Sequence, residues 1–158
     1  MTDPIHYISR YLPVIKKIPK ADVMQIGALS EEQTAAAAEA VRQARGVFTL
    51  VEADGGKAAE KLKSHQLHCV PSLDMVEWTP SSLDWVFLLI DTASYKQTML
   101  LETFQQIEKA VRPKRSISFV METDSPEEWH EELRRAFLTW RIVVDKKQEG
   151  RLLFTAQK

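Results

Sequence analysis

The sequence predicts an α/β fold in which helices cover both faces of a mostly parallel sheet, and three observations lead to this prediction. Short apolar segments alternate with helical segments along the chain, as in parallel sheets. Residues 83–91 (LDWVFLLID) are almost continuously apolar, as expected for a strand that is buried on both faces. The last two strand-like segments, 141–147 and 151–157, are joined by Gln148-Glu149-Gly150, so they form an antiparallel hairpin.

The first 19 residues form a helical lead-in to the first strand. Asp3 is a suitable N-cap, and Pro4 follows it at the first helical position. Pro13 should break or kink this segment. We expect the lead-in to pack beside the first strand through an apolar face made of Ile5, Ile8 and Leu12.

The first strand, Asp22–Ile26, ends at a single glycine, Gly27, and a helix that runs to Arg45 follows. Ser30 is its expected N-cap, and Gln33, three residues later, completes a capping box. The interior of the helix is rich in alanine, which has the highest helix propensity.

Gly46 suits the C′ position of this helix, and a second strand, Val47–Val51, comes next. Glu52 and Asp54 follow that strand directly. Strand, turn, helix and strand in this order are a βαβ unit. Ligands of such sheets bind at the carboxyl ends of the strands, so we expect Gly27, Glu52 and Asp54 at a ligand-binding edge.

The remaining segments complete the sheet. Gly55-Gly56 should turn the chain into a short helix, Lys57–Ser64, and a third strand spans Leu67–Val70. Tyr95–Val111 is predicted to be a long helix, and 115–121 a fifth strand. The next helix begins at the N-cap Ser125 with a proline after it, and its buried stripe should be Trp129, Leu133, Phe137 and Trp140. The hairpin residues expected to pack against it are Val143, Leu152 and Phe154.

Composition limits the possible classes of function. A chain of 158 residues suits one domain, 1–158, and the net charge of −1 does not favour nucleic acid or an acidic membrane as a partner. The basic residues between Arg112 and Arg115 are expected to be a solvated helix end. The single cysteine, Cys69, excludes an internal disulfide. Without an apolar N-terminal segment or a long apolar run, the expected location is the cytoplasm.

The order of elements, together with the segments VMQIGA, SSLDWVFLL, ETFQQIEKAVRP and RLLFTAQK, resembles the class I S-adenosylmethionine-dependent methyltransferases. The resemblance covers nearly the whole chain. It implies a three-layer α/β/α Rossmann-like methyltransferase fold with a seven-stranded sheet. The last strand would be antiparallel and inserted beside the fifth. It also implies S-adenosylmethionine as the cofactor.

The cofactor loop of this family, D/E-x-G-x-G-x-G, is matched only in part. Gln25 stands at the acidic position and Gly27 at the first glycine, whereas Leu29 and Glu31 replace the second and third glycines. Glycines let the backbone approach a ligand closely, and a leucine would fill some of that space. The alternative for Gly27 is a tight turn between strand and helix, without a ligand.

The other cofactor contacts of the family fall on three positions. Glu52 corresponds to the acidic residue that binds the ribose hydroxyls. Ser72 corresponds to the residue near the adenine amino group, and Asp74 could replace it. Trp78 would either stack on the adenine or cover the edge of the sheet.

The catalytic candidates follow the fourth strand, at Asp91 and Tyr95. Asp91, Glu122 and Asp124 end neighbouring strands, where paired acids could hold a divalent ion or act as a general base. The alternative is that Asp124 or Ser125 caps the next helix.

His65, His68 and Cys69 are of residue types that zinc accepts as ligands. Adjacent residues of a strand point to opposite faces, and no second ligand pair has zinc-like spacing. The prediction is therefore no metal site, with Cys69 as a small buried apolar residue.

Two functions remain open. The first is an S-adenosylmethionine-dependent methyltransferase with a divergent cofactor loop and a small-molecule acceptor, which Glu52 and the strand order favour. The second is a non-catalytic methyltransferase-like scaffold or protein-interaction module that has lost cofactor binding, which Gln25, Leu29 and Glu31 favour. Glu31 and Glu32 at the start of a helix would repel a pyrophosphate, which argues against a dinucleotide. Self-association is possible in either case.

Overall fold

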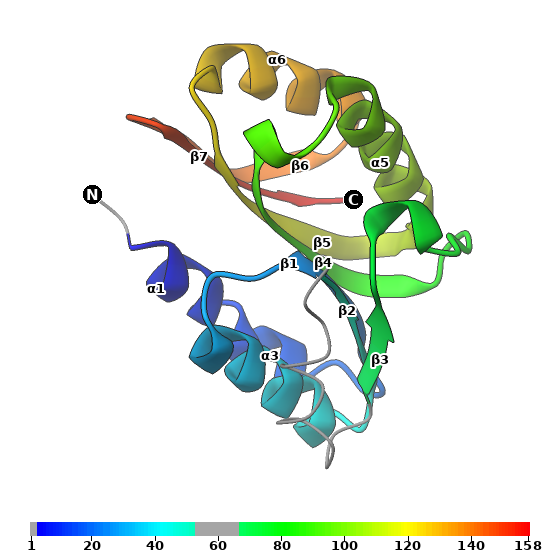
Figure 1. The fold of residues 1–158 in the computed structure, drawn as a ribbon. Helices are drawn as coiled ribbons and strands as arrows, with labels where there is room; N and C mark the ends of the chain where they lie inside the picture. Colours follow the sequence, from blue (N-terminus) through cyan, green and yellow to red (C-terminus); the bar gives the residue numbers. More distant parts are fainter. Residues whose placement is uncertain (1–2, 53–66) are drawn as a thin grey trace.

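The computed structural model describes residues 3–52 and 67–158, and its strands are β1 Asp22–Gly27, β2 Val47–Val51, β3 Leu67–Val70, β4 Leu83–Asp91, β5 Val111–Glu122, β6 Arg141–Gln148 and β7 Arg151–Gln157. Within the described residues they form one seven-stranded sheet in the order β3-β2-β1-β4-β5-β7-β6. Strands β1 to β5 pair in parallel, and β7 is antiparallel to both β5 and β6 (Figure 1). The predicted insertion of the last strand beside the fifth is confirmed.

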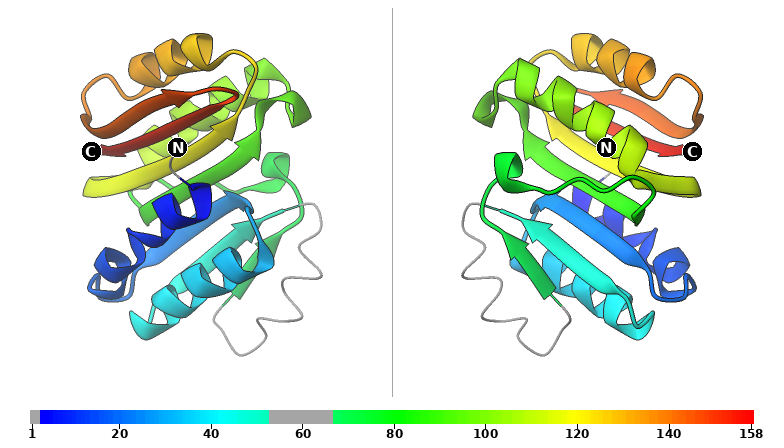
Figure 2. Two further views of the ribbon diagram at one scale, coloured as in Figure 1. Left: turned by 90° about the vertical axis from the view of Figure 1, so that its left-hand side faces the viewer. Right: turned by 90° about the vertical axis from the view of Figure 1, so that its right-hand side faces the viewer.

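The helices form a layer on each face of the sheet (Figures 1 and 2). Their bounds are α1 Pro4–Ser9, α2 Leu12–Lys16, α3 Glu31–Gln43, α5 Gln97–Ala110 and α6 Pro126–Ala136, with short 3-10 turns at Leu73–Met75 and Thr92–Ser94. Side chains of α1, α2 and α3 form one buried cluster with Phe48 and Phe87 of the sheet. Side chains of α5 and α6 form the other with Val86 and Phe119. The three-layer α/β/α fold is thus confirmed.

Part of the prediction lies outside the described residues, namely Asp54, Gly55-Gly56, the helix Lys57–Ser64 and His65. None of the helices in the described part is long and apolar enough to cross a membrane.

The lead-in divides into two short helices. Asp3 caps α1 by accepting a hydrogen bond from the N–H of Ile5, and Pro13 lies in the first turn of α2. Tyr7 anchors α1 to the sheet, because its buried hydroxyl forms a hydrogen bond with that of Thr155. The predicted apolar face needs one correction: Ile5 is 40% exposed, since the face that meets the sheet is instead carried by Tyr7 and its neighbours in the buried cluster.

Strand β4 is buried along its length, with only its last residue exposed. Asp84, near its start, accepts hydrogen bonds from the backbone N–H of Asp22 (2.8 Å) and from the side chains of Arg112 (2.8 Å) and Arg115 (3.1 Å). These arginines belong to β5, which begins at Val111 rather than at residue 115. The prediction that they form a solvated helix end is therefore wrong, because the strand brings them beside a buried carboxylate.

Helix α3 begins at the predicted N-cap but ends with a different C′ residue from the one predicted. The Ser30 hydroxyl accepts a hydrogen bond from the N–H of Gln33 (3.0 Å), as predicted. Arg45, not Gly46, occupies the left-handed C′ position (φ 59°), and the N–H of Gly46 bonds the carbonyl of Val41 (3.0 Å). Gly46 is needed for another reason, since a Cβ there would lie 1.8 Å from the Ala21 carbonyl oxygen.

The hairpin turns at Glu149-Gly150, and Leu152 and Phe154 are fully buried in the cluster that contains α6. Val143, by contrast, is 51% exposed. The reason is a shift in the β6–β7 register between Ile142 and Val144, which leaves Val143 as the extra residue of a bulge.

The buried stripe predicted for α6 is correct, although the helix ends at Ala136. Ser125 occupies the N-cap position, but its side chain forms no capping hydrogen bond. Instead, the N–H of Ser125 donates to the hydroxyl of Thr123 (3.1 Å).

Two substitutions in the hairpin test whether the sheet is packed as described. Phe154→Ala should lower the free energy of unfolding by about 3–5 kcal/mol, because it leaves a cavity in the core. Val143→Ala, at the exposed bulge, should change it by less than about 0.5 kcal/mol. Urea denaturation of both variants measures the difference, and equal effects would contradict the insertion of β7 into the core.

Candidate functional site

The predicted site residues follow the ends of the parallel strands, at one edge of the sheet. Gly27 ends β1, Glu52 follows β2, Asp91 ends β4 and Glu122 ends β5. Asp91 and Glu122 are direct partners in the β4–β5 register.

Gly27 is required by the sheet itself. Its φ of 80° lies in the left-handed region, and a Cβ at this position would be 2.0 Å from the carbonyl oxygen of Leu89 on β4. Of the two alternatives for this glycine, a ligand loop and a tight turn, the packing against β4 supports the turn.

Next to this turn, Gln25 and Gln33 form a closed amide network. Gln25 is fully buried, and its Nε2 donates to the Gly27 carbonyl and to the Thr34 hydroxyl, both at 3.0 Å. Its Oε1 accepts from Nε2 of Gln33 (2.8 Å). The Gln33 Oε1 in turn accepts from the backbone N–H of Leu29 (3.2 Å). The amides of both glutamines are thus used within the protein.

The network corrects the predicted capping box, because the Gln33 side chain binds Leu29 and Gln25 rather than returning to the N-cap. The sequence analysis missed this role of Gln33. A signal was present, since Gln33 lies at helical spacing from Ala37, Ala40 and Ala44, all of which are buried. A glutamine on the buried face of an alanine-rich helix must find polar partners in the core.

Glu52 is half-buried at the end of β2, and its N–H donates to the carbonyl of Val70 (3.1 Å). Burial raises the pKa of the Tyr95 phenol, and the nearby Glu52 carboxylate raises it further. The same two causes raise the pKa of the Cys69 thiol. The charge of Glu52 therefore acts on Tyr95, one of the two catalytic candidates. Cys69 is exposed, contrary to prediction, because β3 is an edge strand.

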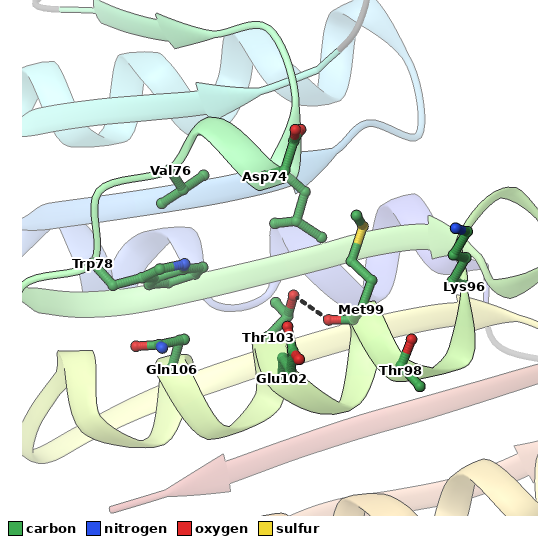
Figure 3. Close-up of a pocket in the computed structure, with 10 residues that line it drawn as sticks. Asp74, Val76, Trp78, Lys96, Thr98, Met99, Glu102, Thr103 and Gln106 are labelled. Carbon is green, nitrogen blue, oxygen red and sulfur yellow. Dashed lines mark hydrogen bonds between the residues drawn. The ribbon is translucent and has the colours of Figure 1, made fainter.

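The two residues predicted to lie near an adenine contact each other: the Ser72 hydroxyl donates to Oδ1 of Asp74 (2.5 Å). Asp74 lines a hollow of about 400 Å³ between residues 73–78 and α5 (Figure 3). Asp74 and Lys96 lie toward one end of this hollow, and Trp78 and Gln106 toward the other.

Trp78 packs against the buried cluster that contains α5. This contact supports the second of its two alternatives, in which it covers the sheet.

A second hollow, of about 530 Å³, opens at the ends of β4 and β5 and brings together Asp91, Tyr95, Asp124 and Trp129. Oδ1 of Asp91 accepts a hydrogen bond from the N–H of Ala93 (3.0 Å), so this carboxylate caps the 3-10 turn after β4. Trp129 was expected only in the core, but it also lines this hollow.

The acids at this edge are partly neutralised. Glu122 forms an ion pair with Arg151 (2.8 Å). Among residues 3–52 and 67–158, no group of three or more His, Cys, Asp or Glu side chains is arranged to hold a metal ion. His68 is exposed on β3.

No protein-family model and no curated protein matches the sequence, but solved structures match the fold. The N-methyltransferase NodS from Bradyrhizobium japonicum WM9, in complex with S-adenosylhomocysteine, is 14% identical, with a TM-score of 0.69 over 99% of this chain and 88% of that chain. The 1,6-didemethyltoxoflavin-N1-methyltransferase of Burkholderia thailandensis is 18% identical, with a TM-score of 0.67 over 98% of this chain and 77% of that chain. An S-adenosylmethionine-dependent methyltransferase from Aquifex aeolicus is 11% identical, with a TM-score of 0.67 over 98% of this chain and 92% of that chain.

Two glycine substitutions separate backbone strain from steric contact at the β1 turn. Gly150→Ala, at a φ of 71° with open space around it, should cost about 1–2 kcal/mol from the left-handed backbone alone. Gly27→Ala carries the same backbone cost and adds the clash with Leu89, so it should cost about 1–3 kcal/mol more. Chemical denaturation compares the two, and a loss at Gly27 no larger than that at Gly150 would remove the proposed close contact.

Proposed function

We propose that this chain, which has the fold of the class I S-adenosylmethionine-dependent methyltransferases, is an S-adenosylmethionine-dependent methyltransferase with a divergent cofactor loop. The observation that carries the proposal is the position of Glu52. It is half-buried directly after β2, whose last residue pairs with Ile26 near the end of β1, and its charge contributes to the raised pKa of Tyr95.

The hydrogen-bonding side chains at this end of the sheet fit the nucleoside half of the cofactor. A carboxylate accepts two hydrogen bonds at once, so Glu52 suits the two hydroxyls of a ribose. The hydrogen-bonded pair Ser72 and Asp74 follows the neighbouring strand β3 and suits an amino group of a base, because the Asp74 carboxylate accepts hydrogen bonds. When bound, S-adenosylmethionine supplies a methyl group on a sulfonium, which transfers directly to a nucleophile.

The hollow at the ends of β4 and β5 is the place for a small methyl acceptor. Tyr95 lines this hollow, and the charge of Glu52 acts on it, so we place the acceptor beside the nucleoside. The Tyr95 phenol is protonated at neutral pH, as an ordinary tyrosine is, and it would orient the acceptor as a hydrogen-bond donor. Asp124 is exposed at the rim and would accept a proton from the acceptor. Direct transfer depends mainly on this positioning.

A second candidate function is a non-catalytic methyltransferase-like module that binds a protein partner. The closed network of Gln25 and Gln33 favours it. The network occupies the loop amide of Leu29, and a leucine stands where the family has a glycine.

Ligand titration separates the two candidates. For the enzyme, S-adenosylmethionine or S-adenosylhomocysteine at 100 times its Kd should stabilise the protein by about 2.7 kcal/mol, seen as a rise in Tm. Thermal-shift and calorimetric titrations measure this effect. A flat response at millimolar ligand rejects the methyltransferase and leaves the binding module.

Replacement of one carboxylate tests the nucleoside contact. Glu52→Gln should weaken S-adenosylhomocysteine binding by roughly 10- to 100-fold, because it removes a charged acceptor of two hydrogen bonds. Glu149→Gln, in the exposed hairpin turn, is the matched control and should bind as the wild type does. Calorimetry gives both affinities. A variant at Glu52 that loses stability but keeps its affinity would mean that this residue has a structural role only.

A further inference from the structure

Several polar groups of the loop between β1 and α3 are already paired within the protein. Both amide atoms of Gln25 are engaged with Gly27, Gln33 and Thr34. The N–H of Leu29 donates to Gln33, and the hydroxyl of Ser30 accepts from the N–H of Gln33. The network is buried, since Gln25, Gln33 and Thr34 are each at most 3% exposed. Opening it to a ligand would leave buried polar groups unpaired.

The acidic charges of this loop disfavour the carboxylate of an amino-acid tail. A carboxylate needs N–H donors or cations, and residues 27–34 (GALSEEQT) contain no basic side chain. Glu31 and Glu32, in the first turn of α3, repel a carboxylate. The buried side chain of Gln25 is neutral, so it does not balance an ammonium.

The nucleoside half of the site differs from this loop. Glu52 lies at the end of β2, with Ser72 and Asp74 after β3, and none of the three takes part in the amide network. A ligand made of a nucleoside and an amino-acid tail would therefore meet two different surfaces. Its nucleoside would lie beside Glu52, Ser72 and Asp74, and its tail beside the amide network.

We propose that the site recognises its ligand mainly through the adenosine part, and that within residues 3–52 and 67–158 it makes no specific contact with the methionine end. The inference rests on the proposed function, and it assigns the ligand class as adenine nucleosides of any 5′ substituent. Gln33 is the residue that determines this specificity, because its side chain occupies the N–H of Leu29 and both hydrogen-bonding positions of Gln25 that face it.

Calorimetric titration of the whole chain with adenosine, 5′-methylthioadenosine and S-adenosylhomocysteine tests this. We expect the three dissociation constants to agree within about threefold, since a tail without partners contributes little. Binding of S-adenosylhomocysteine that is tenfold or more tighter than that of 5′-methylthioadenosine would overturn the inference and leave the methyltransferase proposal standing. If none of the three binds, the proposed function fails and the inference fails with it.

A pair of glutamine substitutions on α3 tests the role of Gln33. Gln33→Ala frees the N–H of Leu29 for a carboxylate, so the affinity for S-adenosylhomocysteine should rise at least about fivefold relative to 5′-methylthioadenosine. Gln43→Ala, at the exposed end of the same helix, should leave the ratio unchanged. An unchanged ratio in a folded Gln33→Ala protein contradicts the assignment of specificity to this residue. The wild-type comparison decides the proposal if that variant does not fold.

Discussion

The burial of β4 on both faces is the constraint on which the rest of the structure depends. Val86 and Leu88 point into the cluster with α5 and α6, and Phe87 and Leu89 into the cluster with α1 to α3. A strand without access to water must pair all its backbone groups, so β4 needs a neighbour on each side. It pairs with β1 and β5. Asp84 joins the starts of these three strands through hydrogen bonds to both neighbours.

The shape of the candidate site follows from this alignment. Because β1, β4 and β5 start together and run in parallel, their ends gather the polar residues at one edge. The close approach of β1 to β4 there leaves no room for a side chain at Gly27. The chain then turns directly into α3, and the polar groups exposed by that turn are satisfied by Gln25 and Gln33. The turn is thus stabilised by side chains of the protein itself.

This edge of the sheet accordingly has two unlike halves. In one half the half-buried carboxylate of Glu52 contributes to the raised pKa of Cys69 and of Tyr95, and Tyr95 lines a hollow. Around Gln25 the backbone and side-chain groups are already paired. The fold is shared with methyltransferases at identities of 18% or less. At such identities the sheet can be alike while the loop between β1 and α3 differs, because the fold alone does not determine the site.

The sequence by itself determined the elements and their order. Continuous apolar segments report strands buried on both faces, and turn residues such as Gly150 and the cap Ser30 act through neighbours only a few residues away. Only the tertiary structure decided which polar groups meet. The Gln33 side chain binds Gln25 rather than the helix cap. Val143 is exposed at a bulge, and Cys69 is exposed on an edge strand. Periodicity indicates which face of an element is buried, whereas hydrogen-bond partners and strand edges depend on segments that are distant in the sequence and are brought together only by folding.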